Sequence, residues 1–487
     1  MTLAPHAIGT LEAPVLDPQP FWLAGAKAKG DAALTVTDKW TRQPVAAVSV
    51  PTAAQVETAL VAADAVRRTS QNLPARVRAD ALAGVADALA ARRDDFAETI
   101  TIESGKPPRW AAREVDRSVS TFRTAAEECR RWDGELQRLD TDTPGDGRFA
   151  LVRRFPHGVV LGITPFNFPL NLVAHKVAPA LAVGAPILLK PAPSTPLTSL
   201  LLGELLAEVG LPAGTWSVLP VPNDRMEALV QDPRIAVVSF TGSSAVGWRI
   251  REALPRKHVL LELGGNAAVI VEPGADVAEV ARSIADFAHY QAGQSCIAVQ
   301  RVYAHSDVYD DVVEAVAAAS AELGRTGMDD HVGPVIDLAA ADRISSWVDE
   351  AVRAGGRVVV GGSVDGTRMA PTVLADVPAT ASVMTEEVFG PVVCMQRYDD
   401  VEEAFEQVNA SKYGLQVGIF THDIRTAFRA HRELEVGGVV VGDVPTYRSD
   451  RMPYGGVKDS GVGREGVRFA MEDFTHQRVM VLSGLDL

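Results

Sequence analysis

From Gly158 onward the sequence repeats one unit: a short run rich in Val, Ile and Leu, a turn, and a segment with helical spacing. Strands are expected over 158–166, 185–192, 216–221 and 235–240, with helices over 171–184, 196–209 and 243–254. Apolar strands that alternate with helices are typical of βαβ units, in which a parallel sheet is covered on both faces. The unit restarts after Gly265 with AAVIVEP, a helical segment over 276–290, and AVQRVYAH, so we expect a second α/β lobe from near residue 264.

The segments outside these repeats have other patterns. Residues 53–98 carry Ala, Leu and Val at helical spacing, and a further helix is expected over 111–129. Residues 134–155 alternate apolar and polar side chains around a Pro-Gly-Asp-Gly turn, which predicts a β-hairpin forming an arm outside the main sheet. Residues 474–487 are strand-like and have no helix of their own, and the Pro-rich residues 1–20 are expected to be loose.

Length and charge exclude several classes of protein. The chain has 487 residues, enough for roughly three domains and for a core that needs no disulfide or metal. Its net charge is −15, and an acidic chain repels the phosphates of nucleic acids. No targeting segment is visible, and no apolar run reaches the ~18 residues of a membrane span. The mean hydropathy of +0.06 is high, so we expect apolar surface to be buried between subunits.

Cys296 is the one cysteine in a context that suits a reactive thiol. The chain has three cysteines, too few for a disulfide framework, which indicates a reducing cytosol. Cys296 follows Gly-Gln-Ser, where a turn would keep the sulfur accessible, and a reactive thiol needs both access and a lowered pKa. Cys129 and Cys394 lie in a helical and a strand-like run, so both are expected to be small core residues, the usual role of a single cysteine.

Polar residues stand where strands of the first lobe end. Glu262 is an acid inside an apolar run, so burial would raise its pKa and suit it to general-base catalysis; an edge-strand Glu facing water fits the local pattern better. Asn167 lies between two prolines, where its amide could donate to an oxyanion, although a turn Asn is the commoner role. The turn 240–243 could bring a helix N-terminus to a phosphate, or simply be a βα turn with an N-capping Ser.

Metal-dependent and P-loop chemistry have no support in the sequence. No HExxH, CxxC or GxxxxGK[ST] motif is present, so no metal site is expected. Single histidines such as His157 and His175 are expected to be ordinary core or surface residues.

These signals occur together and in one order. The motifs are PFNFP (165–169), FTGS (240–243), ELGGN (262–266), GQSC (293–296), EVFGP (387–391) and PYGGVKDSGVGRE (453–465). At this spacing they resemble those of the aldehyde dehydrogenase superfamily, over residues 20–482.

The resemblance implies an α/β aldehyde dehydrogenase fold of three parts. They are a Rossmann-like dinucleotide-binding domain over 1–127 and 148–263, a catalytic α/β domain over 264–458, and a β-hairpin oligomerisation arm from 128–147 and 474–487. It also implies a homodimer or homotetramer, and the cysteine count given above indicates a cytoplasmic location.

The resemblance implies oxidation of an aldehyde to its carboxylate through a covalent intermediate on Cys296. The Asn167 amide and the Cys296 backbone N–H would hold the thiohemiacetal oxygen, hydride transfer would leave a thioester, and Glu262 would activate the hydrolytic water. Lys176 matches a family lysine near the active-site channel. Glu465 matches a second acidic position, with a role in proton relay.

A nicotinamide cofactor, NAD or NADP, is implied as well. Ser243 would contact the pyrophosphate, Lys190 the adenosine ribose and Glu387 the nicotinamide ribose, and Phe389 would pack beside the nicotinamide. The other cofactor positions that the resemblance implies are Thr164, Pro165, Phe166, Pro193, Ser194, Thr241, Gly242, Val246 and Leu263. NAD-selective members often carry a glutamate where this chain has Pro193. Proline neither repels a 2′-phosphate nor donates a hydrogen bond to it, so the choice between NAD and NADP stays open.

The substrate is indicated by the loop before the PYGG motif. By its spacing from Glu465, Arg448 lies where family members with aromatic pockets have an apolar wall residue. An Arg at this position could bind a carboxylate or phosphate through two parallel hydrogen bonds. Arg117, on the helix near the tunnel mouth, is a second candidate cation. The alternative for Arg448 is a surface ion pair with Asp450 or Asp443.

Two departures make the pocket less basic than in the most anion-adapted members: Ser295 stands where some of them have Arg, and Phe168 follows the oxyanion Asn. The motifs resemble most closely the branch acting on lactaldehyde, succinate semialdehyde and phosphonoacetaldehyde. We therefore expect a small polar or singly anionic aldehyde. Two alternatives stay open: a CoA-acylating semialdehyde dehydrogenase, which would usually lack the base at Glu262, and a structural homologue without activity.

Overall fold

The first lobe contains an eight-stranded sheet whose central strands are mostly apolar. The computed structural model describes residues 16–484, so most of the segment expected to be loose lies outside the described residues. The strand order is β2-β1-β9-β8-β7-β10-β11-β23. The five neighbouring strands β9, β8, β7, β10 and β11 run parallel to one another. All five residues of β7 are buried, as expected for a strand covered on both faces. The strands are β1 (Phe21–Leu23), β2 (Ala26–Ala28), β7 (Val159–Ile163), β8 (Ile187–Lys190), β9 (Trp216–Val218), β10 (Ile235–Thr241), β11 (His258–Glu262) and β23 (Gly461–Val462).

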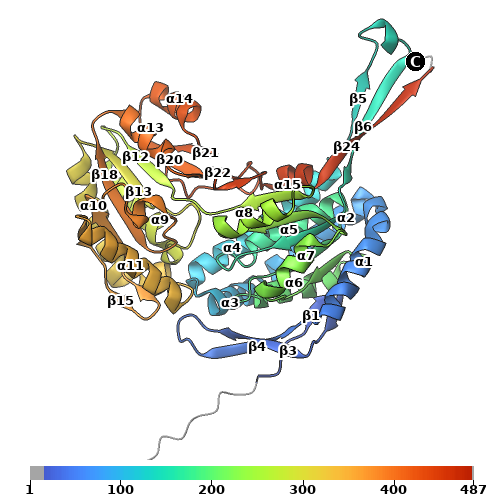
Figure 1. Cartoon of the computed structure of the whole chain (residues 1–487), viewed down its shortest axis with the longest axis horizontal. Coiled ribbons are helices and arrows are strands. Elements are labelled where there is room, and N and C mark those ends of the chain that lie inside the picture. The colour runs from blue at the N-terminus through green and yellow to red at the C-terminus, as the bar shows by residue number, and fades with distance from the viewer. Residues whose placement is uncertain (1–15, 485–487) are drawn as a thin grey trace, which may run out of the picture.

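Helices link these strands as the alternating pattern predicts. They are α5 (Asn171–Val183), α6 (Leu197–Glu208), α7 (Met226–Gln231) and α8 (Ser244–Ala253). Helix α5 is buried along its whole length and ends at Gly184 in the left-handed conformation. The expected βαβ units of the first lobe are therefore confirmed (Figure 1).

The segment 53–98, expected as one helix, is part of three. Helix α1 (Ala53–Asn72) begins with a capping box on Thr52, and α2 (Ala75–Ala91) and α3 (Arg93–Ser104) follow. The first break falls at Pro74, because proline lacks an N–H and disfavours helical geometry in the residue before it. The second break, at Arg92, has no such signal. The helix expected over 111–129 is confirmed as α4 (Pro108–Arg130).

The second lobe contains a seven-stranded sheet in the order β14-β17-β18-β13-β12-β20-β21, parallel except for β14. Its strands are β12 (Ala268–Val271), β13 (Arg301–His305), β14 (Arg357–Val360), β17 (Thr372–Ala375), β18 (Val392–Tyr398), β20 (Gln416–Phe420) and β21 (Gly438–Val441). Its helices are α9 (Val277–His289), α10 (Tyr309–Thr326), α11 (Leu338–Arg353), α12 (Ser382–Thr385), α13 (Val401–Asn409) and α14 (Ile424–Glu433). The α/β lobe expected after residue 264 is thus present, beside the first lobe (Figure 1).

A three-stranded sheet projects from the body of the molecule (Figure 1). The expected hairpin is present as β5 (Glu135–Arg138) and β6 (Arg148–Pro156), and the tail strand β24 (Thr475–Ser483) pairs with β6 along its whole length. The expected domain boundary at residue 148 divides this sheet, whereas the structure keeps β6 with β5 and β24. Helix α15 (Val467–Asp473), just before β24, packs into the core of the first lobe.

The remaining strands of the described chain are short or lie outside the large sheets. They are the hairpin β3 (Ala32–Thr37) and β4 (Pro44–Val50), and the short strands β15 (Val364–Asp365), β16 (Arg368–Met369), β19 (Tyr413–Gly414) and β22 (Val457–Lys458). Between residues 16 and 484, no helix has the length and apolar character needed to cross a membrane.

Candidate active site

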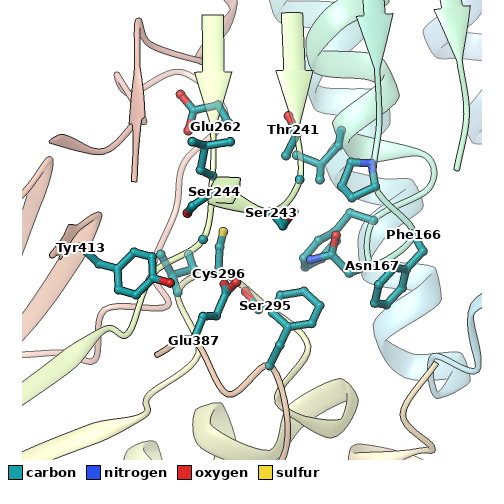
Figure 2. A pocket seen from close by; sticks show the side chains of 18 of the residues that line it. Phe166, Asn167, Thr241, Ser243, Ser244, Glu262, Ser295, Cys296, Glu387 and Tyr413 are labelled. Atoms are coloured by element: carbon teal, nitrogen blue, oxygen red, sulfur yellow. The ribbon is translucent and has the colours of Figure 1, made fainter. Parts of the chain in front are cut away.

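A cavity of about 460 Å³ lies where β7, β10 and β11 end. In a parallel sheet the residues that follow the carboxyl ends of neighbouring strands share one edge, which is where α/β proteins bind ligands. Figure 2 shows Cys296, Glu387 and Asn167 around this cavity, with Thr241 and Glu262 at the tips of adjacent strands. The predicted site residues that line it are Arg117, Pro165, Phe166, Asn167, Phe168, Thr241, Gly242, Ser243, Glu262, Leu263, Ser295, Cys296, Glu387, Phe389, Arg448 and Glu465.

Cys296 follows a strained turn that fixes the sulfur at the cavity. Gln291 and Ala292 have positive φ angles of 41° and 56°, unusual for residues other than glycine, and Gly293 follows with 66°. The Cys296 residue is partly exposed, whereas Cys129 and Cys394 are buried, as predicted. Burial raises the pKa of the Cys296 thiol to about 12, contrary to the lowered pKa expected of a reactive thiol. The resting thiol is therefore neutral and needs a base.

Glu262 is a buried carboxyl group that lines the same cavity. It is the last residue of β11, between β10 and β23, so the alternative of an edge-strand residue facing water is wrong. Its Oε2 has no hydrogen-bond partner within residues 16–484. Burial, helped by the nearby negative charge of Glu465, raises the pKa of Glu262 well above its usual value.

Asn167 is tied to the loop that carries the thiol. Its Nδ2 donates to the backbone oxygen of Gln294 at 3.0 Å. A primary amide has two N–H bonds, so one remains for an oxygen in the cavity.

A buried ion pair holds the other end of the Asn167 loop. Glu114 on α4 accepts hydrogen bonds from the backbone N–H groups of Leu170 (2.9 Å) and Asn171 (3.0 Å) at the start of α5. Its other oxygen pairs with the buried Lys106, whose Nζ lies 3.9 Å from the centre of the Phe168 ring. The sequence analysis missed Glu114, on α4, and Lys106, between α3 and α4, because an isolated charge in the sequence gives no sign of its burial.

Three charged side chains form one buried cluster beside Glu262. Glu465 accepts hydrogen bonds from Lys176 Nζ at 3.2 Å and from Arg448 Nη2 at 2.9 Å. Lys176 also donates to Ser239 at 3.0 Å and lies behind the cavity wall, whereas Arg448 and Glu465 line the cavity. The two cations hold the pKa of Glu465 well below its usual value. Arg448 is therefore buried, and the alternative of a surface pair with Asp450 or Asp443 is wrong.

Arg117 is held by Asp450 instead. Its Nη2 donates to Asp450 Oδ1 at 2.8 Å, and the same oxygen is 3.1 Å from His175 Nε2. Burial lowers the pKa of His175, so this group of three carries little net charge at neutral pH. The Nε atoms of both Arg117 and Arg448 have no hydrogen-bond partner within residues 16–484.

The residues around the turn after β10 fit a dinucleotide. Ser243 is the N-cap residue of α8, but its side chain makes no capping hydrogen bond. The buried Oγ of the neighbouring Ser244 has no hydrogen-bond partner in the described part of the chain. Free N–H groups and hydroxyls at a helix N-terminus suit a phosphate. The sequence analysis did not name Ser244.

Glu387 and Phe389 form the opposite wall. Glu387 accepts a hydrogen bond from the backbone N–H of Gly265 at 3.2 Å, and burial raises its pKa to about 7. A Cβ at Gly264 would collide with the Glu387 carboxylate in this position, so a larger residue there would displace that carboxylate. The rings of Phe166 and Phe389 meet edge to face at 5.7 Å. The residues present thus fit a group with a phosphate at one end and a ribose at the other.

Five of the predicted cofactor residues do not line this cavity: Thr164, Lys190, Pro193, Ser194 and Val246. Lys190 ends β8 and donates to Asn223 Oδ1 at 2.5 Å, and burial lowers its pKa to about 8. Lys39, which the sequence analysis did not name, donates a hydrogen bond from its Nζ to the Ser194 backbone oxygen at 3.4 Å. Among residues 16–484, no cluster of three His, Cys, Asp or Glu side chains could hold a metal ion.

Comparison with known proteins agrees with this geometry. A model of the aldehyde dehydrogenase family matches residues 26–480. The chain is 41% identical over 455 residues to the 3-sulfolactaldehyde dehydrogenase of Priestia aryabhattai, covering 92% of this chain and 95% of that protein.

Solved structures agree as well. The crystal structure of aldehyde dehydrogenase 21 from Physcomitrella patens, in complex with the reaction product succinate, superposes with a TM-score of 0.94 at 42% identity and covers 97% of this chain and 100% of that one. The NADP-dependent glyceraldehyde-3-phosphate dehydrogenase from Bacillus halodurans, complexed with NADP, gives a TM-score of 0.92 at 32% identity, over 96% of this chain and 99% of that one.

The chain belongs to the aldehyde dehydrogenase family. It is an oxidoreductase that oxidises an aldehyde with NAD or NADP.

Proposed function

We propose that this enzyme oxidises a small, polar or singly anionic aldehyde to its carboxylate. One observation carries the proposal: in the cluster of Lys176, Arg448 and Glu465, two positive charges face one negative charge. The cluster therefore has one positive charge more than negative, and Arg448 is the cation of the two that lines the cavity. A substrate tail with one negative charge matches it. Two relatives support this class of substrate. One is named a 3-sulfolactaldehyde dehydrogenase and the other was solved in complex with the product succinate, and both compounds are small anions.

We propose Cys296 as the nucleophile and Glu262 as the base. Glu262 takes the thiol proton, the sulfur bonds to the aldehyde carbon, and the carbonyl oxygen becomes an oxyanion. The free N–H of the Asn167 amide and the backbone N–H of Cys296 donate to that oxygen. After hydride loss the sulfur carries a thioester. Glu262 passes the thiol proton to solvent and then removes a proton from water, which replaces the sulfur and releases the carboxylate.

NAD or NADP supplies the hydride acceptor when bound. Ser243 and Ser244 at the start of α8 would hold its phosphates, and Glu387 its nicotinamide ribose, with Phe389 and Phe166 as the apolar wall. Glu465 keeps Lys176 and Arg448 in place and shares a proton path with Glu262. The retained Glu262 supports hydrolysis over transfer to CoA, because hydrolysis needs a base for water.

We also propose self-association through the projecting sheet. Val479, Met480 and Val481 on β24 are each more than half exposed, which is costly for apolar side chains in water. Burying them against another subunit gives a dimer or tetramer.

We propose a cytoplasmic location on the basis of the cysteines. All three are free thiols, and Cys296 must stay reduced to act as the nucleophile.

A spectrophotometric panel tests the proposal. Succinate semialdehyde, lactaldehyde, 3-sulfolactaldehyde and uncharged aldehydes of similar length are compared with NAD and with NADP, with and without CoA. We expect the highest kcat/KM for a singly charged aldehyde and no need for CoA. Cys296→Ala should remove turnover while cofactor binding survives. Preference for long apolar aldehydes, or turnover that requires CoA, would contradict the proposal.

A further inference from the structure

Tyr454 lies beside the nucleophile in a position that the backbone fixes. Its side chain is 4% exposed and packs with Ile297 and Leu415. Its N–H donates to the Glu465 backbone oxygen at 2.9 Å, and the Glu465 N–H returns a bond of 2.6 Å. The ring therefore has little freedom to move away from the cavity that it lines.

The Tyr454 hydroxyl meets the reactive sulfur. The two atoms, Tyr454 Oη and Cys296 Sγ, are 2.9 Å apart. Within the described part of the chain, this sulfur is the one recorded hydrogen-bond partner of the hydroxyl. A buried hydroxyl is normally satisfied by a partner, so this contact is the interaction that holds it.

Arg448 lies over the face of the same ring, with its guanidinium 3.8 Å from the ring centre. Arg448 cannot lose its charge, and Glu465 fixes its position on the other side. A fixed positive charge over the ring withdraws electron density from the phenol, so it strengthens the hydroxyl as a hydrogen-bond donor. Donation toward sulfur favours the thiolate, whereas acceptance from the S–H group would favour the thiol.

We propose that the Tyr454 hydroxyl is a catalytic hydrogen-bond donor to Cys296 Sγ, which stabilises the thiolate and holds it for attack. The inference rests on the proposed function, in which Cys296 is the nucleophile. Burial raises the pKa of Cys296, and the hydrogen bond from Tyr454 opposes that rise. Hydrogen bonds to charged groups are the stronger ones, so this donor offsets part of the cost of forming a buried thiolate.

The rate of Cys296 alkylation against pH tests the donor without cofactor or substrate. Iodoacetamide forms a carbon–sulfur bond with the thiolate, releases iodide, and leaves the thiol proton in water. Tyr454→Phe keeps the ring and its contact with Arg448 and removes only the hydroxyl. Tyr447→Phe, in the same loop but 56% exposed, is the matched control, and Cys296→Ala gives the background.

We expect Tyr454→Phe to be alkylated ~10-fold more slowly than the wild type between neutral and mildly alkaline pH, which corresponds to a rise of about one unit in the pKa of the thiol, and Tyr447→Phe to match the wild type. An unchanged profile would overturn the proposal. Faster alkylation of Tyr454→Phe at neutral pH would overturn it too, since the hydroxyl would then be an acceptor that holds the thiol form.

Steady-state kinetics separate this result from the proposed function. Tyr454→Phe should lower kcat, with an unchanged KM for the cofactor and an unchanged melting temperature. If Cys296→Ala kept turnover, the proposed function would fail, while the alkylation profiles would still decide the direction of the hydrogen bond.

Discussion

Replacing Arg448 by Leu should separate charged from uncharged substrates. The guanidinium lines the cavity, so its positive charge is within reach of a substrate tail. A hydrogen bond between charged groups contributes about 1.5–3 kcal/mol, and each ~1.4 kcal/mol is tenfold in kcat/KM. Arg448→Leu should therefore lower kcat/KM for succinate semialdehyde by ~10- to 100-fold relative to butyraldehyde.

The ratio of the two substrates is the informative quantity. Loss of Arg448 also leaves Glu465 with Lys176 alone and removes the cation over Tyr454, and both effects act on every aldehyde. They cancel in the ratio, which isolates the contact with the tail. Arg451→Leu is the matched control, because Arg451 lies in the same loop but pairs with Glu127 at the surface. An equal loss for both substrates would refute the conclusion that Arg448 recognises the charge of the tail.

Three further predictions follow from other contacts. The kcat should fall as pH drops through the raised pKa of Glu262, since only its carboxylate accepts a proton from water; a pH profile with an acidic midpoint at or below 4.5 would contradict this. Glu114→Gln should lower the free energy of unfolding by about 3 kcal/mol in denaturant titration, because it leaves Lys106 buried without its charged partner. Adding Lys106→Met should restore part of the lost free energy. A decrease of no more than ~0.5 kcal/mol in Glu114→Gln would argue against this ion pair. Val481→Asp should reduce the mass measured by light scattering, whereas Val364→Asp, on an exposed strand away from the arm, should not; equal masses would exclude the arm as the interface.

The alternation of apolar strands with helices was enough to predict both lobes, because buried parallel strands need apolar residues at every position. The hairpin and the tail strand were also predictable, and the family resemblance placed them in one arm, but nothing local in residues 148–156 or 475–483 shows that these two segments pair. The break of the first helix at Pro74 has a sequence cause that the periodicity hid. The break at Arg92 has no such signal in the sequence.

The lining of the site was predictable from motifs, but its electrostatics were not. The motifs name Cys296 and Glu262, yet the burial that raises both pKa values depends on residues far away in sequence. Arg448 was found by spacing, whereas its partner Glu465 was assigned a separate role, because a buried ion pair leaves no pattern in the sequence. The hydroxyl of Tyr454 lies in a quoted motif, and only the fold shows that it reaches the sulfur.

Covalent capture on Cys296 is the most direct test of the central claim. Glu262→Gln is mixed with an aldehyde and NAD or NADP, and the protein is followed by absorbance and by intact-mass and peptide mass spectrometry. The mechanism predicts a burst of one reduced cofactor per site and an acyl adduct that maps to Cys296 and persists, because the water lacks its base. If removal of the thiol proton limits the burst, the burst is slower but still ends at the adduct. Undiminished steady turnover without an adduct, or an adduct on another residue, would contradict the assignment.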